Sequence, residues 1–332
     1  MKFKERKTFT LLANRINTEL PLPIIIDDEN SIDKATDIEI NLIKHKIDDI
    51  VNSNLAIGSS NPFEMVSIEE EGKRRKENPP NRSKIAEKNN WQYWVVRHNN
   101  RRRLKQPYET LYSLINSELK PIMDFYSDYY ETEEGIKISG DKGWNAFAFN
   151  QIYEMGHTRK ETYINNEDII YLQKLLKSYE KIDFENDEFE FIKRSIHNYR
   201  ILMSMKIYQD LRVIGKFAII ESLLTSRNSI QLNSINFQLQ NKIPLINNRL
   251  VEKINFRNNL DNLPDTFTDH KIIEKLYNYR SCIAHGNKPD FKENLQHLKN
   301  SVYADDIVDE ICRKIMAHAI TEPELINDLR KC

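Results

Sequence analysis

The stretch Ile192–Leu224, IKRSIHNYRILMSMKIYQDLRVIGKFAIIESLL, decides the fold of the C-terminal part of the chain. Apolar residues recur along it in steps of three and four, the spacing that places side chains on one face of an α-helix. The stretch therefore predicts one amphipathic helix, with Gly215 as the position where a kink is allowed. The residues of the apolar track are Ile192, Ile196, Tyr199, Met203, Ile207, Leu211, Ile214 and Ala218.

Three further helical segments follow in the sequence. The segment Ile235–Arg257 is interrupted by Pro244, and the segments His270–His285 and Ala304–Ala319 come after a polar connection. Helices joined in this way are typical of a bundle. We therefore predict an all-α, four-helix domain over residues 186–332.

Residues 1–185 have a different pattern. Runs of β-branched and aromatic residues at Leu22–Ile26, Phe63–Ile68 and Trp91–Val96 predict strands, and Gln106–Tyr129 has a helical pattern. These features predict an α+β domain over residues 1–185, before the helical one, and leave its role open between sensing, regulation and RNA selection.

Composition excludes several kinds of site. The 332 residues include only 8 Gly and 11 Pro, with no G-x-G-x-x-G and no Gly-Lys followed by Ser or Thr, so a phosphate-cradling loop is not expected. The 3 Cys and 8 His have no metal-ligand spacing. No apolar run approaches the roughly 20 residues of a membrane span, and no signal core follows the N-terminus. We expect a cytoplasmic protein without metal, cofactor or membrane contact.

The third predicted helix ends in Leu276–Gly286, LYNYRSCIAHG, which contains Arg280 and His285. RNA carries its own nucleophile, so its cleavage without a metal requires a base for the 2′-OH proton, an acid for the 5′-oxygen and a cation for the phosphorane. Imidazole titrates near neutrality, and a planar guanidinium matches two phosphate oxygens. Arg280 and His285 are therefore candidate catalytic residues.

This motif resembles that of the HEPN superfamily, whose ribonucleases carry R-x4–6-H at the end of a helix in a four-helix bundle. The form here looks closest to the ApeA-like HEPN branch, with Ser281 where many members have Asn, Asp or His. The upstream segment Phe217–Leu224, FAIIESLL, fits the same picture, and the resemblance covers roughly residues 190–325. It implies a metal-independent endoribonuclease that leaves a 2′,3′-cyclic phosphate. It also implies an antiviral abortive-infection effector or toxin, with an antitoxin or a phage-derived trigger as a further partner.

Helical spacing separates the two catalytic candidates. Arg280 and His285 are five positions apart, about 140° around a regular helix, so they do not share a face. Unwinding at Gly286, a π-bulge, or a composite site across a two-fold dimer would each bring them together. The resemblance implies the third arrangement, a homodimer in which the motifs of two copies face each other.

Supporting residues are expected around Arg280. Glu221 projects from an apolar stripe, where a carboxylate is seldom unpaired, so we predict that it orients Arg280. Tyr277 could stack a base or bond a phosphate, or pack in the core. Simpler alternatives remain: His285 followed by Gly286 is an ordinary helix stop, Arg280 could be a structural cation, and Glu221 could extend to the surface.

A second nucleic-acid contact is predicted in the N-terminal domain, where basic residues follow aromatic ones. The alternative is a half-buried strand with a solvated turn, because Trp91, Tyr93 and Val95 alternate. Residues 191–332 contain 21 Lys and Arg against 16 Asp and Glu, a net charge of +5 that favours a polyanionic partner only weakly. The rival function is a non-catalytic module that dimerises or binds RNA or protein. The predicted RNA-binding residues are Arg97, Arg101, Arg102 and Arg103.

Overall fold

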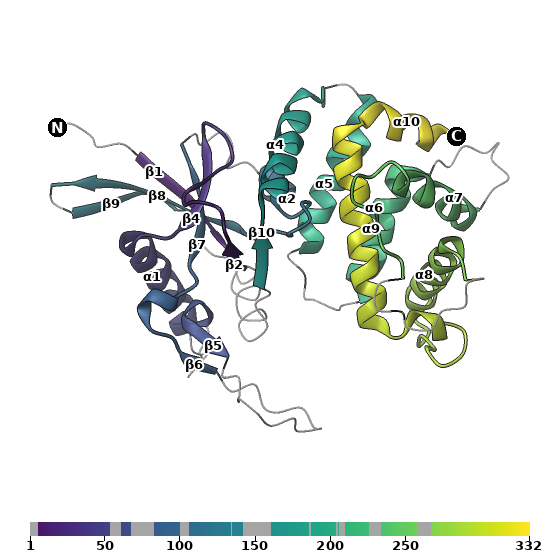
Figure 1. Ribbon diagram of the computed structural model, residues 1–332, viewed down its shortest axis with the longest axis horizontal. Helices are drawn as coiled ribbons and strands as arrows, with labels where there is room; N and C mark the ends of the chain where they lie inside the picture. Colours follow the sequence, from purple (N-terminus) through teal and green to yellow (C-terminus); the bar gives the residue numbers. More distant parts are fainter. Residues whose placement is uncertain are drawn as a thin grey trace. The chain divides into compact units, whose positions relative to one another are not determined.

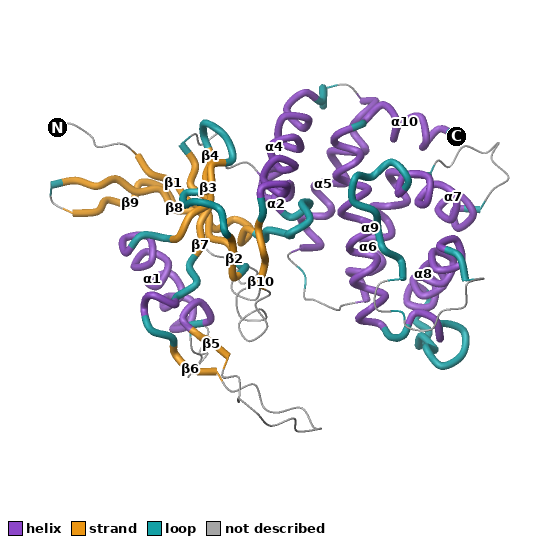
Figure 2. The backbone as a smooth tube through the Cα atoms, viewed as in Figure 1, coloured by secondary structure: helices purple, strands orange, loops and turns teal. Residues whose placement is uncertain are grey.

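A computed structural model describes residues 6–53, 61–67, 83–99, 106–133, 135–141, 161–185, 187–203, 205, 210–225, 234–257, 260 and 267–332. The chain divides into two compact units, Met1–Gln173 and Lys174–Cys332. The division falls inside helix α4 (Asn166–Lys181), N-terminal to the boundary expected at residues 185–186. The first unit contains an antiparallel sheet and the second is helical (Figures 1 and 2). The α+β N-terminal region and the helical C-terminal region predicted from the sequence are both present.

The main sheet of the N-terminal unit has six antiparallel strands in the order β3-β4-β7-β1-β8-β9. The first strand of the chain therefore lies inside the sheet, where Phe9 is opposite Arg97 on one side and Ser127 on the other. Two smaller sheets pair β2 with β10 and β5 with β6. The strands are β1 (Arg6–Leu12), β2 (Arg15–Thr18), β3 (Ile24–Ile25), β4 (Asn30–Lys34), β5 (Met65–Ser67), β6 (Ser83–Ile85), β7 (Trp94–His98), β8 (Pro121–Thr132), β9 (Gly135–Asp141) and β10 (Glu161–Ile164).

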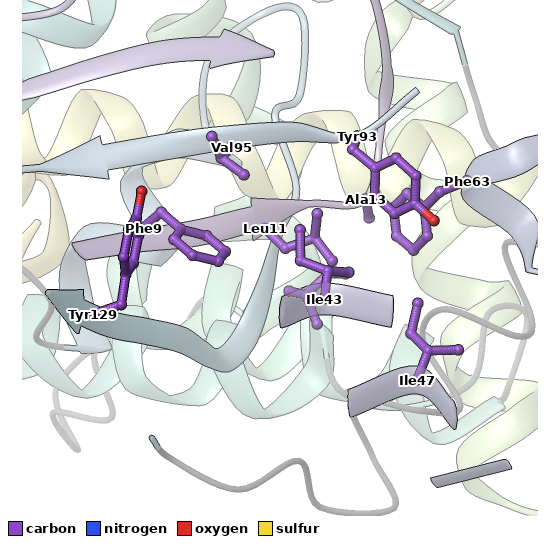
Figure 3. Close-up of a cluster of buried hydrophobic side chains, with 10 residues drawn as sticks. Phe9, Leu11, Ala13, Ile43, Ile47, Phe63, Tyr93, Val95 and Tyr129 are labelled. Carbon is purple, nitrogen blue, oxygen red and sulfur yellow. The ribbon is translucent and has the colours of Figure 1, made fainter. Parts of the chain in front are cut away.

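Helix α1 (Asp37–Ser53) covers one face of this sheet and encloses a hydrophobic core (Figure 3). It begins with a capping box, in which the Thr36 hydroxyl accepts a hydrogen bond from the Glu39 amide and the Glu39 carboxylate accepts one from the Thr36 amide. Its inward side chains, one turn apart, meet alternate residues of β1 and β7. The cluster consists of Phe9, Leu11, Ala13, Ile43, Ile47, Phe63, Tyr93, Val95, Ile122 and Tyr129.

The helix predicted over Gln106–Tyr129 is wrong beyond its first two turns. Helix α2 covers only Gln106–Tyr112, and β8 begins at Pro121. Glu118 has a positive φ of 50°, which a helix cannot contain, and the proline that follows favours an extended chain. Because β8 pairs with both β1 and β9, sheet pairing outweighs the local helical pattern.

The three predicted strands are present in shortened or shifted form, as β3, β5 and β7. β7 begins at Trp94, so Trp91 precedes the strand. Val95 and Val96, which point to opposite faces, are 0% and 1% exposed. The strand is therefore buried on both faces. The alternation of Trp91, Tyr93 and Val95 predicted a strand with one exposed face, which is not observed.

His98 lies at the end of β7 with a buried side chain. Its Nε2 is 3.0 Å from the Thr10 hydroxyl, and its Nδ1 is 2.8 Å from the Asn30 side-chain oxygen. Burial lowers the pKa of His98 to about 4, against a small opposing effect of Asp27. The imidazole is therefore neutral at physiological pH and satisfied by neutral partners.

The C-terminal unit is built around helix α6. This helix contacts all the other helices from α5 to α10, so it is the central one. Its mostly apolar sequence agrees with that position, because a helix packed on several sides has no single polar face. The helices predicted over Ile235–Arg257, His270–His285 and Ala304–Ala319 correspond to α7, α8 and α9. The helices are α5 (Glu190–Met203), α6 (Asp210–Leu224), α7 (Ile235–Asn247), α8 (Asp269–Ala284), α9 (Ser301–Thr321) and α10 (Pro323–Lys331).

The single helix predicted over Ile192–Leu224 is wrong, because α5 and α6 are separate helices. The hydroxyl groups of Ser195 and Ser222 are 3.0 Å apart, and Leu202 packs on Gly215, so the two helices run antiparallel. A Cβ atom at Gly215 would lie 2.4 Å from Leu202 Cδ2. Gly215 therefore lies within the uninterrupted helix α6 and permits a close contact with α5.

Along α6, the residues of the predicted apolar track do not coincide with the residues that are buried. Leu211 is 64% exposed, whereas Lys216 is 2% exposed. The Lys216 ammonium lies 2.8 Å from Asp305 and 3.0 Å from Asp309, both on α9. Asp309 in turn lies 3.1 Å from the guanidinium of Arg313. Carboxylates from another helix thus make the burial of a lysine possible, which the local sequence of α6 does not indicate.

None of the helices in the described part of the chain is both long and apolar enough to cross a bilayer.

Candidate functional site

Helices α6 and α8 bring Glu221 and Arg280 together. The Arg280 Nη2 atom lies 3.4 Å from Glu221 Oε1, and the two side chains are 24% and 15% exposed. The pairing predicted from a carboxylate inside an apolar helix is therefore present. At partial burial such a pair keeps more of its strength than an exposed one, because solvent screens it less.

Tyr277, nearly one turn before Arg280 on α8, covers a face of the guanidinium. The Arg280 guanidinium carbon is 5.5 Å from the centre of the tyrosine ring, within cation–π range. The same ring meets Phe217 of α6 edge to face, with centroids 6.1 Å apart. Burial, and secondarily the charge of Glu221, raise the pKa of the Tyr277 hydroxyl. Tyr277 thus both packs against α6 and holds Arg280 in position.

Arg280 keeps most of its hydrogen-bonding capacity. A guanidinium has five N–H donors. Among the described residues Arg280 makes the ion pair with Glu221 but no hydrogen bond, and its Nε is buried without an acceptor. The group is therefore held in place by a charge and an aromatic ring, and none of its N–H groups donates a hydrogen bond to a described residue.

His285 is the C-cap residue of α8 and is exposed. Its amide donates to the Ser281 carbonyl at 3.1 Å. Gly286 follows with a φ of +71°, a conformation that favours glycine. The amides of Gly286 and Asn287 donate to the Ile283 and Cys282 carbonyls, which completes a Schellman motif. The backbone of His285 therefore has the helix-stop role considered in the sequence analysis.

The side chain of His285 has no hydrogen bond or ion pair with any residue that the structure describes, Arg280 included. Helix α8 is regular to Ala284, so the π-bulge considered as one route does not occur within it. The chain leaves the helix at His285, but no hydrogen bond or ion pair between His285 and Arg280 accompanies this among the described residues, so unwinding at Gly286 as a means of joining the two side chains stays a prediction. The composite site across a dimer stays a prediction.

Ser281 lies between the two candidates and is partly buried. Its carbonyl accepts the His285 amide, and its hydroxyl makes no hydrogen bond with a described residue. The loop after α8 is tied back to the helix. The Lys275 ammonium donates to the Asn294 carbonyl at 2.8 Å, and the rings of Tyr279 and Phe291 are 5.5 Å apart. The end of α8 is therefore anchored on both sides of the motif.

Arg97, predicted to bind RNA, is occupied by protein partners. It forms ion pairs with Asp33 and Glu39, the latter at 3.0 Å, and it donates to the Lys34 carbonyl at 2.8 Å. Burial by itself lowers the pKa of Arg97, but the hydrogen bonds and charges of Glu39 and Asp33 outweigh it and raise the pKa above the ordinary value. Arg97 therefore ties β7 to β4 and α1. Arg101, Arg102 and Arg103 lie outside the described residues.

The buried charges of α6 and α9 were not found from the sequence. Asp305, Asp309 and Arg313 follow one another at intervals of four, a spacing that places them on one face of a helix and could have indicated a charged stripe. No comparable signal marks Lys216. Among the residues that the structure describes, no group of three His, Cys, Asp or Glu is placed to hold a metal ion.

Comparison with protein-family models, curated proteins and solved structures gives no significant match.

Proposed function

We propose that the C-terminal unit is a HEPN-like, four-helix-type nuclease domain that cleaves RNA without a metal. The observation that carries the proposal is the state of Arg280, which Glu221 and Tyr277 hold in place while its N–H donors have no protein acceptor among the described residues. A cation that is positioned but not hydrogen-bonded suits the stabilisation of a phosphorane.

In the proposed reaction the 2′-oxygen of a ribose attacks the adjacent phosphorus and the bond from phosphorus to the 5′-oxygen breaks. The 2′-OH proton passes to a base, and the departing 5′-oxygen gains a proton, so the products are a 2′,3′-cyclic phosphate and a 5′-OH. His285, exposed and with a side chain free of described partners, acts as base or acid. Arg280 stabilises the charge on the phosphorane.

We further propose that the site is composite and lies in a homodimer. The attacking 2′-oxygen and the departing 5′-oxygen lie on opposite sides of the phosphorus in an in-line displacement, so one imidazole does not reach both, whereas two copies of His285 in one cleft supply both a base and an acid. By resemblance, the biological role is that of an antiviral abortive-infection effector or toxin, with the N-terminal unit responding to an antitoxin or a phage-derived trigger.

One observation favours a second candidate, a non-catalytic helical module that dimerises or binds RNA or protein. The Schellman motif accounts for Gly286 and for the backbone of His285 without any chemistry. In this alternative Arg280 and Glu221 serve only to join α8 to α6.

The deciding experiment is RNA cleavage by the purified full chain in EDTA. The test variants are Arg280→Ala and His285→Ala. The matched controls are Arg249→Ala, which removes an exposed arginine paired with Glu322, and His270→Ala, which removes an exposed histidine at the other end of α8. Circular dichroism and thermal melting confirm folding in each case.

The proposal expects cleavage in EDTA by the wild type and both controls, a cyclic-phosphate end on the product, and loss of cleavage in both test variants. Equal cleavage by all five proteins would assign the activity to a contaminant and refute the proposal. Adding an excess of His285→Ala to the wild type should lower cleavage below the value expected from dilution alone, because a mixed dimer has only one of the two His285 side chains that the shared site requires.

A further inference from the structure

The N-terminal unit has an open pocket of about 550 Å³ where the end of β4 and the start of α1 approach the segment that precedes β7. This volume is in the range of small-molecule sites. The lining residues relevant here are Lys34, Asp37, Lys88, Asn89, Trp91 and Tyr93.

One wall of the pocket is aromatic and fixed by the protein. The Trp91 indole donates to the Ala86 carbonyl at 3.0 Å, and its ring meets Tyr93 edge to face at 6.1 Å. The Tyr93 hydroxyl donates to Glu64 and accepts from Asn61, both at 2.8 Å. The Lys44 ammonium lies 4.8 Å from the centre of the Trp91 ring, and the part of the indole that it does not cover is partly exposed and lines the pocket.

The rim of the pocket is cationic. Lys34 is exposed, with its ammonium 5.9 Å from the Trp94 ring centre. Lys88 pairs with Asp37 at 2.7 Å, but the two side chains are 62% and 71% exposed. An ion pair so exposed contributes little and exchanges readily with other anions. A phosphate can therefore replace the Asp37 carboxylate on Lys88 without the loss of a strong internal contact.

We propose that this pocket binds a nucleotide, with the base against Trp91 and the phosphate between Lys34 and Lys88. An aromatic wall suits the π-face of a base, ammonium groups at the rim suit a phosphate, and the exposed amide of Asn89 can pair with the edge of a base. A purely apolar ligand would leave the lysines unused, and a bare anion would leave the aromatic wall unused. The proposal does not depend on the nuclease activity.

The test is calorimetric titration of the full chain with adenosine 5′-monophosphate, adenosine and inorganic phosphate. Stacking and phosphate contacts act together, so the nucleotide should bind at least about tenfold more tightly than either part alone. Lys88→Gln should weaken binding of the nucleotide at least about fivefold. Lys7→Gln is the matched control, because Lys7 is an exposed lysine of the same unit that also has a carboxylate partner, Glu131. It should leave binding unchanged.

Trp91 packs against the core, so its replacement can disturb folding; the indole is therefore observed rather than removed. In ¹⁵N-labelled protein the Trp91 indole resonance should shift on addition of the nucleotide. The proposal is overturned if the nucleotide does not bind at millimolar concentration, if phosphate binds as well as the nucleotide, or if Lys34→Gln/Lys88→Gln binds like wild type. A 5′-phosphorylated RNA dinucleotide distinguishes two possible ligands, the 5′ end of an RNA and a free nucleotide. Tighter binding of the dinucleotide than of the mononucleotide indicates an RNA end. Weaker binding indicates a free nucleotide.

Discussion

Arg97 in the sheet and Arg280 in the helical unit are closely comparable, since their side chains are 26% and 24% exposed and each lies beside a carboxylate. Their guanidinium groups are used differently. Arg97 donates to Asp33, Glu39 and a backbone carbonyl, so few N–H groups remain. Arg280 has one ion pair and no hydrogen bond with the described residues.

The difference shows why residue type and exposure do not separate a structural arginine from a binding one. The two kinds of arginine are separated by the number of guanidinium N–H groups that already donate to protein acceptors, because an anion binds only to donors that the protein leaves available. By this criterion Arg97 is structural and Arg280 is a candidate for phosphate. Four measurements test this difference between Arg97 and Arg280.

The largest effect is expected from Arg280→Lys. The substitution keeps the charge but removes the planar fork, so the rate of RNA cleavage in EDTA should fall by at least about 100-fold while the melting temperature changes little. Single-turnover cleavage measures it. Arg97→Lys should leave the rate unchanged in protein that remains folded, and an equal loss of rate in both variants would end the distinction.

Arg97→Ala should instead destabilise the fold by about 3 to 4 kcal/mol, because Glu39, whose side chain is 2% exposed, is left buried beside Asp33 without its cation. Urea unfolding followed by tryptophan fluorescence measures this, since Trp91, Trp94 and Trp144 all belong to the N-terminal unit. Arg249→Ala, which breaks an exposed pair, should cost less than about 1 kcal/mol. Equally small losses in the free energy of unfolding for Arg97→Ala and Arg249→Ala would show that Arg97 is not structural.

His98, next to Arg97 on β7, should make the stability of the N-terminal unit depend on pH. The unfolded imidazole takes up a proton near pH 6.5, whereas the folded one, with its pKa lowered to about 4, does not. The contribution is therefore complete above pH 6.5 and is lost as pH falls toward 4, by about 3 kcal/mol. Urea midpoints at several pH values measure it. His98→Gln should flatten this part of the profile, and an unchanged profile would contradict the assignment.

The smallest effect is expected from a double-mutant cycle on Arg280 and Glu221. A single ion pair at 3.4 Å with partial exposure should couple by about 0.5 to 1 kcal/mol. The same cycle on Arg97 and Glu39, joined by two hydrogen bonds, should give a larger coupling energy. Zero coupling between Arg280 and Glu221 would show that Glu221 does not orient Arg280. A larger coupling energy for this pair than for Arg97 and Glu39 would contradict the distinction between the two arginines.

Sequence reasoning succeeded where interactions are local or marked by an unusual residue. The local sequence predicted helices at α7, α8 and α9, and a carboxylate within FAIIESLL predicted the pair of Glu221 with Arg280. It failed where residues far apart in the sequence determine which side chains are buried and which strands pair. The partners of Arg97 and the order of the strands come from other segments, and Lys216 is buried only because α9 supplies Asp305 and Asp309. The close contact of Gly215 with Leu202 joins two helices, so a sequence pattern interpreted as one helix does not reveal it.

The position of β1 inside the sheet sets an order for assembly on the ribosome. β1 pairs with β7 and β8, so its two edges are satisfied only after the chain has been made as far as Thr132, and β2 waits for β10 at Glu161–Ile164. Strand pairings this distant form slowly compared with local helix contacts. The edges of β1 therefore stay unpaired while the chain between β1 and β8 is made, and an unpaired strand of this kind is prone to aggregation.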